Sequence, residues 1–313
     1  MKDWMTKVEI PISEEKIGYK DKVLLLGSCF ADNIGAKFES HYFQAIVNPF
    51  GTLYNPASIM KAITLSYKHD NKHYLLHHNG LWHSMMHHGS FSHPDKSVLL
   101  NRYEESQRIM REALHEASTI VVTFGTSWIY TMEGMIVANC HKMPANRFRR
   151  ECMTAGRIIE MWLPLLVQIP NKHWIFTVSP IRHVKDGFHA NHLSKACLLQ
   201  AIDTLISNAE CINPASTYSY FPSYEIMLDE LRDYRFYAED MVHPSSLAVE
   251  YIWNRFLDTY MSDNTRDQMR VLHQLWRDRH HRCLHPESQE AKAFEQHLSE
   301  RVTKLKQVYP WLE

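Results

Sequence analysis

The chain has 313 residues, with 34 Lys and Arg against 35 Asp and Glu, and a formal charge of -1. Hydrophobic residues make up 45% and charged residues 22%, a globular composition that excludes a disordered chain. The balanced charge argues against nucleic acid or an anionic membrane surface as a partner. Only 10 Gly are present and neither G-x-G-x-x-G nor a Walker motif occurs, so no phosphate-cradling loop and no cofactor are expected.

The sequence predicts a cytoplasmic protein. The first ten residues lack the apolar core of a signal peptide, and no run approaches the roughly 18 apolar residues of a membrane span. No C-x-x-C motif occurs, and scattered cysteines in such a chain are typical of reduced thiols. The six cysteines are at positions 29, 140, 152, 197, 211 and 283.

Three short apolar runs predict strands that are buried on both faces. They are 23–26, 119–124 and 174–178, and each ends in a polar turn: Gly27-Ser28, Gly125-Thr126-Ser127 and Ser179-Pro180. Amphipathic segments alternate with these runs, which indicates a parallel sheet covered by helices. In such sheets the chemistry collects at the carboxyl ends of the strands, where these turns lie.

The remaining pattern predicts helices and two hairpins. Helices are expected over 32–43, 57–67, 158–169 with a local fault at Pro164, 193–206 with Leu193 on its apolar face, and 246–260. Asn101 with Glu104 resembles a capping box that opens a further helix. Turn signals at 79–80 and 133–134 predict the hairpins.

The character of the chain changes after about residue 264. Two apolar stripes at helical spacing are separated by Pro286, which predicts a helical hairpin. We therefore predict two units, a sheet domain over 1–263 and a helical extension over 264–313.

A nucleophile and a base can be proposed from the residues alone. Ser28 follows a buried strand and precedes a helix, where a hydroxyl is exposed near backbone N–H groups; such a serine is also a common helix cap. Asp240 and His243 stand three apart before Pro244, so the carboxylate can hold one imidazole nitrogen while the other faces Ser28. This pattern is typical of a Ser-His-Asp triad, although D-x-x-H also occurs by chance.

Together these segments resemble a known family. Residues 27–31 spell G-S-C-F-A, and the chain is similar over about 5–260 to the GSCFA family of the SGNH (GDSL-like) hydrolase superfamily. Further matching words are N-P-F-G-T-L-Y-N-P (48–56), F-G-T-S-W-I-Y (124–130), A-N-C-H-K (138–142), S-P-I-R-H (179–183) and D-E-L-R-D-Y-R-F-Y-A-E-D-M-V-H-P (229–244).

The resemblance implies a flavodoxin-like three-layer α/β/α fold with about five parallel strands. It implies Ser28 as nucleophile, His243 as general base and Asp240 as the residue that orients His243. An oxyanion hole is implied at the N–H groups of Ser28 and Gly51. The superfamily's G-x-N-D block corresponds here to residues 125–128, which lack the Asn, so Ser127 is the substitute donor.

Other residues allow more than one interpretation. Cys29 adjoins the proposed nucleophile and is expected to pack beneath the turn. Substrate contacts are expected from Asn139, His141, Arg182, His183 and His88, with an internal salt bridge as the alternative for the 182–183 pair. A histidine-rich segment suggests a metal site, but without accompanying cysteines or carboxylates surface histidines are favoured and no metal is expected. Its members are His73, His77, His78, His83, His87, His88 and His93.

The leading hypothesis is a serine esterase that removes a short acyl group, such as acetyl, from a carbohydrate-like or other small-molecule ester. An O-acyltransferase would use the same site with an alcohol in place of water. A non-catalytic binding protein on a decayed esterase fold is the third hypothesis, motivated by the missing Asn. A metal-binding protein that uses the histidine-rich segment is the fourth.

Overall fold

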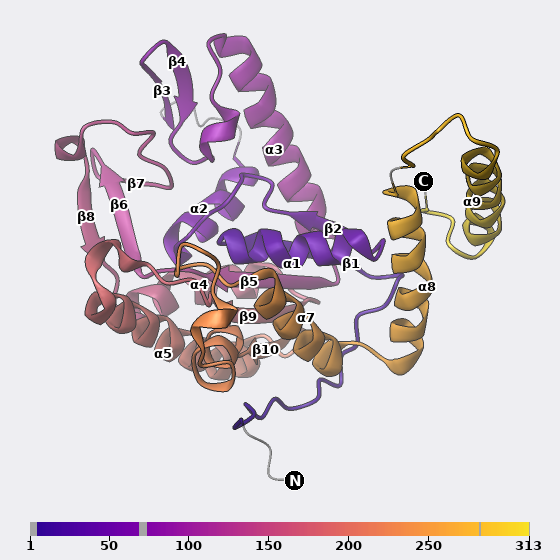
Figure 1. The fold of residues 1–313 in the computed structure, drawn as a ribbon. Helices are drawn as coiled ribbons and strands as arrows, with labels where there is room; N and C mark the ends of the chain where they lie inside the picture. Colours follow the sequence, from indigo (N-terminus) through magenta and orange to yellow (C-terminus); the bar gives the residue numbers. More distant parts are fainter. Residues whose placement is uncertain (1–4, 69–73, 282, 313) are drawn as a thin grey trace.

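The computed structural model describes residues 5–68, 74–281 and 283–312 (Figure 1). At its centre is a parallel five-stranded sheet in the order β10-β9-β5-β1-β2. With helices on both faces it is a flavodoxin-like three-layer α/β/α fold, as the sequence predicted. The strands are β1 (Lys22–Gly27), β2 (Gln44–Val47), β5 (Thr119–Phe124), β9 (His173–Val178) and β10 (Thr217–Phe221).

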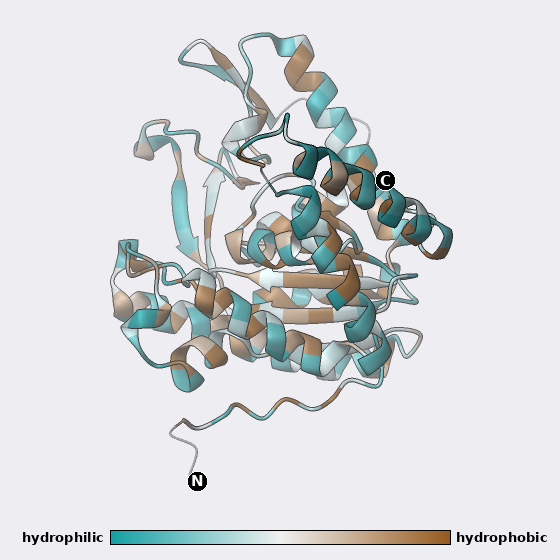
Figure 2. Cartoon of the chain, turned by 45° about the vertical axis from the view of Figure 1, so that its right-hand side comes forward, coloured by the Kyte–Doolittle hydropathy of each residue, from teal (hydrophilic) through white to brown (hydrophobic). Residues whose placement is uncertain are grey.

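Two hydrophobic clusters cover the two faces of this sheet, because alternate strand residues point to opposite sides. One face, with Leu24 and Val122, packs against α2 (Pro56–Ser66), α3 (Lys96–Glu116), α4 (Ala155–Gln168) and α5 (Phe188–Ile212). The other face, with Leu25 and Val121, packs against α1 (Cys29–Ser40) and α7 (Ser246–Tyr260). In Figure 2 the central strands are accordingly mostly brown.

Two small antiparallel sheets are inserted between these elements. One is the hairpin of β3 (Leu75–His78) and β4 (Leu81–Ser84), whose turn has positive φ at Asn79 and Gly80 as expected for an Asn-Gly turn. The other orders its strands β7-β6-β8. Its strands are β6 (Trp128–Met132), β7 (Met135–Val137) and β8 (Arg149–Cys152).

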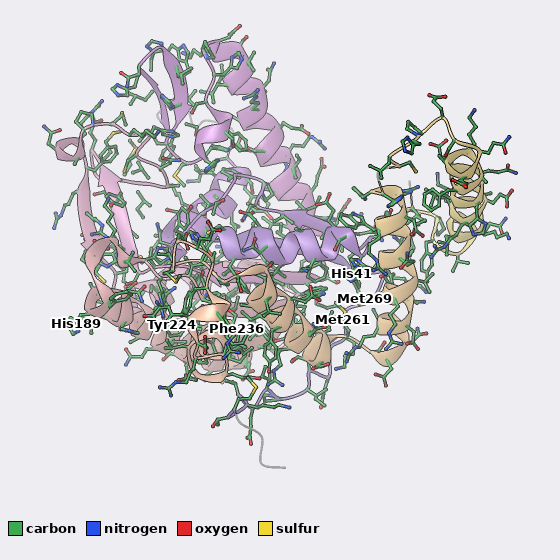
Figure 3. All side chains as sticks on the ribbon, viewed as in Figure 1. His41, His189, Tyr224, Phe236, Met261 and Met269 are labelled. Atoms are coloured by element: carbon green, nitrogen blue, oxygen red, sulfur yellow. The ribbon has the colours of Figure 1, made fainter. Side chains whose placement is uncertain are left out.

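The C-terminal segment folds into α8 (Asp263–Arg279) and α9 (Gln289–Val308), as the apolar stripes predicted. Leu272 and Leu275 of α8, with Tyr309 and Leu312 beyond α9, join the hydrophobic cluster of α1 and α7. Figure 3 labels His41, Met261 and Met269 where α8 meets the rest of the molecule. Most of α9 is polar and teal in Figure 2.

Several expected boundaries are wrong. The predicted capping box at Asn101 lies inside α3, which begins at Lys96 because the carboxylate of Asp95 accepts the Ser97 N–H at 2.7 Å. The first helix ends at Ser40, and Tyr42 then turns the chain at φ 59° into β2, which the pattern did not predict. Strand β10 was missed as well; β2 and β10 are the edges of the central sheet and carry weaker apolar patterns. The short strand β8 of the inserted sheet was also not predicted.

Three short helical segments lie in the loops near the carboxyl ends of the strands. They are η4 (Val184–Asp186), α6 (Ser223–Glu225) with η5 (Ile226–Glu230), and η6 (Tyr234–Phe236). Elsewhere η2 (Gly89–Phe91) and η3 (Ala145–Arg147) interrupt loops.

Candidate active site

The carboxyl end of β1 makes a turn that only glycine can form. Gly27 has φ 134°, and a Cβ added there would lie 2.1 Å from the carbonyl oxygen of Thr123 on β5. The next N–H, that of Ser28, donates to the same oxygen at 3.2 Å. The chain then enters α1 at Cys29. The turn lies between β1 and β5, where the strand order reverses, which is the usual site position in this class of sheet.

A second loop supplies an imidazole held by a carboxylate. Oδ1 of Asp240 accepts the N–H groups of Val242 and His243 at 2.9 Å each, and Oδ2 pairs with Nδ1 of His243 at 2.6 Å. The backbone and ring hydrogen bonds from His243 lower the pKa of Asp240 to about 2. Because the carboxylate is ionised, it favours the proton on Nδ1 and leaves Nε2 able to accept one. The D-x-x-H spacing thus produces the expected hydrogen bond.

The group that meets this imidazole is Cys29. Its Sγ lies 3.8 Å from Nε2 of His243. Ser28 is fully buried, and its Oγ folds back as the helix cap to accept the Phe30 N–H at 3.3 Å. Among the described residues no hydrogen bond joins Ser28 to His243. The expected Ser28–His243 pairing is therefore not present in this geometry. Cys29 packs against the hydrophobic cluster of α1 and α7, as expected, and its Sγ also faces the imidazole.

The physical reason is the position of each residue in the helix. An N-cap side chain bends back toward the first free N–H groups, whereas the first helical residue points outward from the turn. Serine is preferred at the N-cap. This preference is the signal in the sequence that Ser28 caps α1 and that the side chain of Cys29 points out of the turn.

Cys29 lies in a half-buried environment with charges of both signs. Burial is the largest influence and raises the pKa of its thiol, and Asp32 raises it further; its own N–H, Lys195 and the Phe30 N–H lower it. These two N–H groups belong to the first turn of α1, whose dipole favours an anion.

Lys195 is a buried cation that the sequence did not single out. Its Nζ donates to the carbonyl oxygens of Gly125 and Ser179 at 2.7 Å each, and so joins the ends of β5 and β9. Desolvation lowers its pKa to about 7. The expected helix face was wrong here, because Leu193 is 58% exposed while Ser194 and Lys195 are buried. Because a helical periodicity assigns a lysine to the solvent face, the sequence pattern did not indicate that Lys195 is buried.

A polar network fixes the loop that follows β2 against the β1 turn. The side-chain amide of Asn48 accepts the Gly27 N–H at 2.8 Å and donates to Asp32 at 2.6 Å. Thr52 donates to the other oxygen of Asp32 at 3.0 Å. Asp32 is thereby held near the thiol, where its charge opposes thiolate formation.

The three expected oxyanion donors all have partners within the protein. The Ser28 N–H donates to the Thr123 carbonyl oxygen at 3.2 Å. The Gly51 N–H donates to the Asn48 carbonyl oxygen at 2.7 Å inside a tight turn. The Ser127 hydroxyl bonds Ser194 at 3.0 Å and Cys152 at 3.1 Å, on the side of α5 and β8. The oxyanion hole at Gly51 and Ser127 stays a prediction, since it requires both groups to exchange these partners for a substrate.

Three of the expected substrate residues lie in the inserted elements. Asn139 accepts the His141 N–H at 2.9 Å, and the His141 ring bonds the Ser84 carbonyl oxygen at 2.8 Å, so the pair fixes a turn to the β3–β4 hairpin. His88 is exposed and caps η2. None of the three has a described contact with Cys29 or His243.

The pair after β9 lies closer to the site. The ring of His183 packs edge-on to Tyr54, and burial lowers its pKa to about 4. A Cβ added at Gly125 would contact both this ring and Ser28, which places His183 beside the β1 turn. Arg182 points the other way, over the ring of Tyr237. It forms no salt bridge in the described part of the chain, so that alternative for Arg182 is wrong.

The histidine-rich segment can be followed in the structure from residue 74 onward. Within 5–68, 74–281 and 283–312, no group of three or more His, Cys, Asp or Glu could hold a metal ion. His87 is buried between the hydroxyls of Ser84 and Ser106, at 2.7 and 2.8 Å. His73 falls outside the described residues.

The fold and the site define a class: a flavodoxin-like α/β protein with a cysteine facing an Asp-His pair at the switch point of its sheet. The chain belongs to the GSCFA family, whose profile matches residues 22–256. No curated protein matches the chain. No helix in the described ranges has the length and apolar character needed to cross a membrane. All six cysteines are free.

Proposed function

We propose that this protein transfers acyl groups from small-molecule esters or thioesters through a Cys29-His243-Asp240 triad. The observation that carries the proposal is the 3.8 Å contact between Sγ and Nε2, combined with the 2.6 Å hydrogen bond on the opposite nitrogen. Together they are the nucleophile, base and orienting group of covalent acyl transfer. A thiol needs less activation than a hydroxyl, because it is more acidic and more nucleophilic; since burial raises the pKa of the Cys29 thiol, His243 has to take its proton during the attack.

In the first half-reaction Sγ attacks the acyl carbonyl carbon while its proton passes to Nε2 of His243. The tetrahedral intermediate collapses, the carbon–oxygen or carbon–sulfur bond to the leaving group breaks, and Nε2 returns the proton to that group. The N–H of Cys29, at the start of α1, is the proposed donor to the developing oxyanion.

In the second half-reaction His243 takes a proton from water or an alcohol, whose oxygen attacks the thioester carbon. The Sγ–carbon bond breaks, and the thiolate leaves and recovers the proton from Nε2. Water gives a hydrolase and an acceptor hydroxyl gives an O-acyltransferase; the triad serves both equally.

A serine esterase with Ser28 as nucleophile is the second candidate. It is favoured by the position of Ser28 at the strand end, beside Cys29, and by the resemblance to SGNH hydrolases. It requires the hydroxyl to leave its capping bond with the Phe30 N–H.

Acyl-enzyme trapping separates these candidates. Wild type, Cys29→Ala, Ser28→Ala and the exposed-cysteine control Cys211→Ala are incubated with 4-nitrophenyl acetate, quenched in acid and mapped by peptide mass spectrometry. We expect a label on Cys29 that neutral hydroxylamine removes, as it does thioesters. The label and turnover should persist in Ser28→Ala and Cys211→Ala.

In Cys29→Ala the kcat/KM should fall by about 10³-fold or more, because members of a triad act as a unit. A label on Ser28 that survives neutral hydroxylamine and persists in Cys29→Ala would instead support the serine esterase. No label and no turnover with acetyl, butyryl or thioester substrates would contradict both and support the binding protein.

A further inference from the structure

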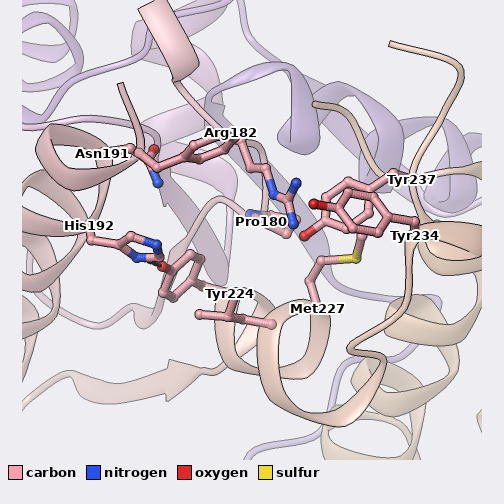
Figure 4. A pocket seen from close by; sticks show the side chains of 10 residues that line it. Pro180, Arg182, Asn191, His192, Tyr224, Met227, Tyr234 and Tyr237 are labelled. Carbon is pink, nitrogen blue, oxygen red and sulfur yellow. Dashed lines mark hydrogen bonds between the residues drawn. The ribbon is translucent and has the colours of Figure 1, made fainter. Parts of the chain in front are cut away.

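Figure 4 shows a small pocket that is lined in part by Arg182. Arg182 bonds the carbonyl oxygens of Met241 and Val242, so the pocket lies next to the loop that carries Asp240 and His243. The pocket has a volume of about 170 Å³. For comparison, a cavity of about 150 Å³ holds one benzene molecule. The pocket is therefore the size of a single ring or a short chain with one polar group.

The cation of this pocket is Arg182, which is held by aromatic rings. Its guanidinium carbon lies 3.8 Å from the ring centroid of Tyr237 and 5.3 Å from that of Tyr234. Stacking fixes the plane of a guanidinium while its N–H groups, which lie in the plane, remain able to donate.

Those N–H groups have only two described partners. The Arg182 side chain forms a long hydrogen bond, 3.5 Å to the Met241 carbonyl oxygen, and a hydrogen bond with the side chain of Tyr237. The partly buried Arg150 and Arg301, by contrast, are each paired with an aspartate. Among the described residues no carboxylate lies within ion-pair distance of Arg182.

The rest of the lining has the same character. Figure 4 shows His192 and Tyr224 across the pocket from Arg182, and their side chains share a 3.1 Å hydrogen bond. The ten lining residues include an arginine, a histidine and three tyrosines but no Asp or Glu. A fixed guanidinium that pairs with no carboxylate of the described residues, in a tyrosine-lined pocket, is suited to bidentate recognition of an anionic group.

Two backbone connections link this pocket to the proposed triad. The Arg182 N–H donates to the Val242 carbonyl oxygen at 3.2 Å, next to His243. The following residue, His183, lies beside the turn of β1 that presents Cys29. The segment 181–183 thus has the pocket on one side and the thiol turn on the other.

We propose that this pocket binds an anionic group, a carboxylate or a phosphate, on a ring or short chain of the ester substrate. The inference rests on the proposed function and adds its substrate class: esters that carry a negative charge on the part distal to the acyl carbon. Arg182 is the specificity-determining residue, because its donors match two oxygens of one such group.

Three phenyl acetates that differ only in the group at the para position test the inference. They are 4-acetoxybenzoate, its neutral isostere 4-acetoxybenzamide, and 4-acetoxyphenyl phosphate. The release of each phenol is followed by chromatography with wild type, Arg182→Gln, Arg182→Lys and the nearby control Arg235→Gln, which removes an exposed arginine paired with Asp233. The readout is the ratio of kcat/KM between each anionic ester and the amide.

We expect wild type to favour at least one anionic ester by about tenfold or more, the scale of a charge-assisted pair. Arg182→Gln should bring that ratio near one, Arg182→Lys should retain part of it, and Arg235→Gln should keep the wild-type value. The carboxylate and phosphate arms identify which anion is preferred. A wild-type ratio near one, or an unchanged ratio in a folded Arg182→Gln, overturns the inference.

The experiment distinguishes failure of the proposed acyl transfer by Cys29 from failure of the proposed anion binding at Arg182. Turnover of the amide by wild type but not by Cys29→Ala keeps the proposed function even when the anion preference is absent. Where no ester is cleaved, calorimetric titration of 4-hydroxybenzoate and 4-hydroxybenzamide into wild type and Arg182→Gln tests the pocket directly. Equal binding of the two compounds to wild type would overturn it.

Discussion

At the residue scale, Lys195 is a buried amine whose positive charge favours the Cys29 thiolate, against the larger opposing effect of Asp32. It is fully buried, holds the ends of two strands and lowers the pKa of Cys29. A cation near a thiolate favours the ionised form, and it does so more strongly where water is excluded.

Lys195→Met should therefore raise the apparent pKa of Cys29 and slow its alkylation at neutral pH. The measurement is the rate of carbamidomethylation of Cys29 by iodoacetamide across pH, quantified by peptide mass spectrometry. The exposed Lys185→Met is the matched control and should leave the pH profile unchanged. The same profile in wild type and a folded Lys195→Met would show that Lys195 only supports the two strand ends.

At the scale of elements, the approach of β1 to β5 determines where the thiol is presented. Gly27 has a positive φ, and a Cβ added there would lie 2.1 Å from the Thr123 carbonyl oxygen. Because glycine has no Cβ, the turn stays close enough to β5 for the Ser28 N–H to bond that oxygen before α1 begins. Gly156, near the start of α4, is a contrasting glycine, because a Cβ added there contacts nothing within 4 Å.

We expect Gly27→Ala to lower the free energy of unfolding by more than about 2 kcal/mol, because it combines a backbone clash with a strained φ. Gly156→Ala should raise it by about 0.4–1 kcal/mol by restricting the unfolded chain. Urea unfolding of both variants followed by circular dichroism measures the difference. Equal stability of the two variants would contradict this description of the turn.

At the scale of the whole molecule, several histidines are buried as neutral rings in separate parts of the fold. Desolvation is the main cause in each case, and it lowers the pKa to about 3 for His87 and to about 4 for the others. The group comprises His41, His87, His141, His173 and His183.

These shifts predict acid lability with a definite sign. Above the unfolded pKa of about 6.5 all five rings are neutral in both states and contribute nothing to the pH dependence. As the pH falls toward 4, the unfolded chain binds protons that the folded rings do not, so stability is lost. At pH 5.5 each ring costs up to about 1.4 kcal/mol, less where solvent reaches it.

Urea unfolding at pH 7.5, 6.5 and 5.5 should show this decline. His173→Gln removes one buried ring and should flatten the dependence, whereas the exposed His189→Gln (Figure 3) should retain the wild-type slope. A stability that is constant from pH 7.5 to 5.5 would contradict neutral burial of these rings.

Local sequence determined much of this molecule because the relevant signals act over a few residues. Continuous apolar runs predicted β1, β5 and β9 within about a residue, and the Asn79-Gly80 turn predicted a hairpin. The three-residue spacing of Asp240 and His243 likewise gave their hydrogen bond. Resemblance along the chain gave the family.

Tertiary structure decided what depends on partners distant in sequence. Edge strands β2 and β10 are defined by their neighbours in the sheet rather than by their own patterns. Lys195 is buried because two strand ends supply carbonyl partners, which no helical periodicity reveals. Whether Ser28 or Cys29 meets His243 depends on the capping geometry of α1 and on a loop more than 200 residues away, because the direction of a side chain is fixed only once both segments are packed together.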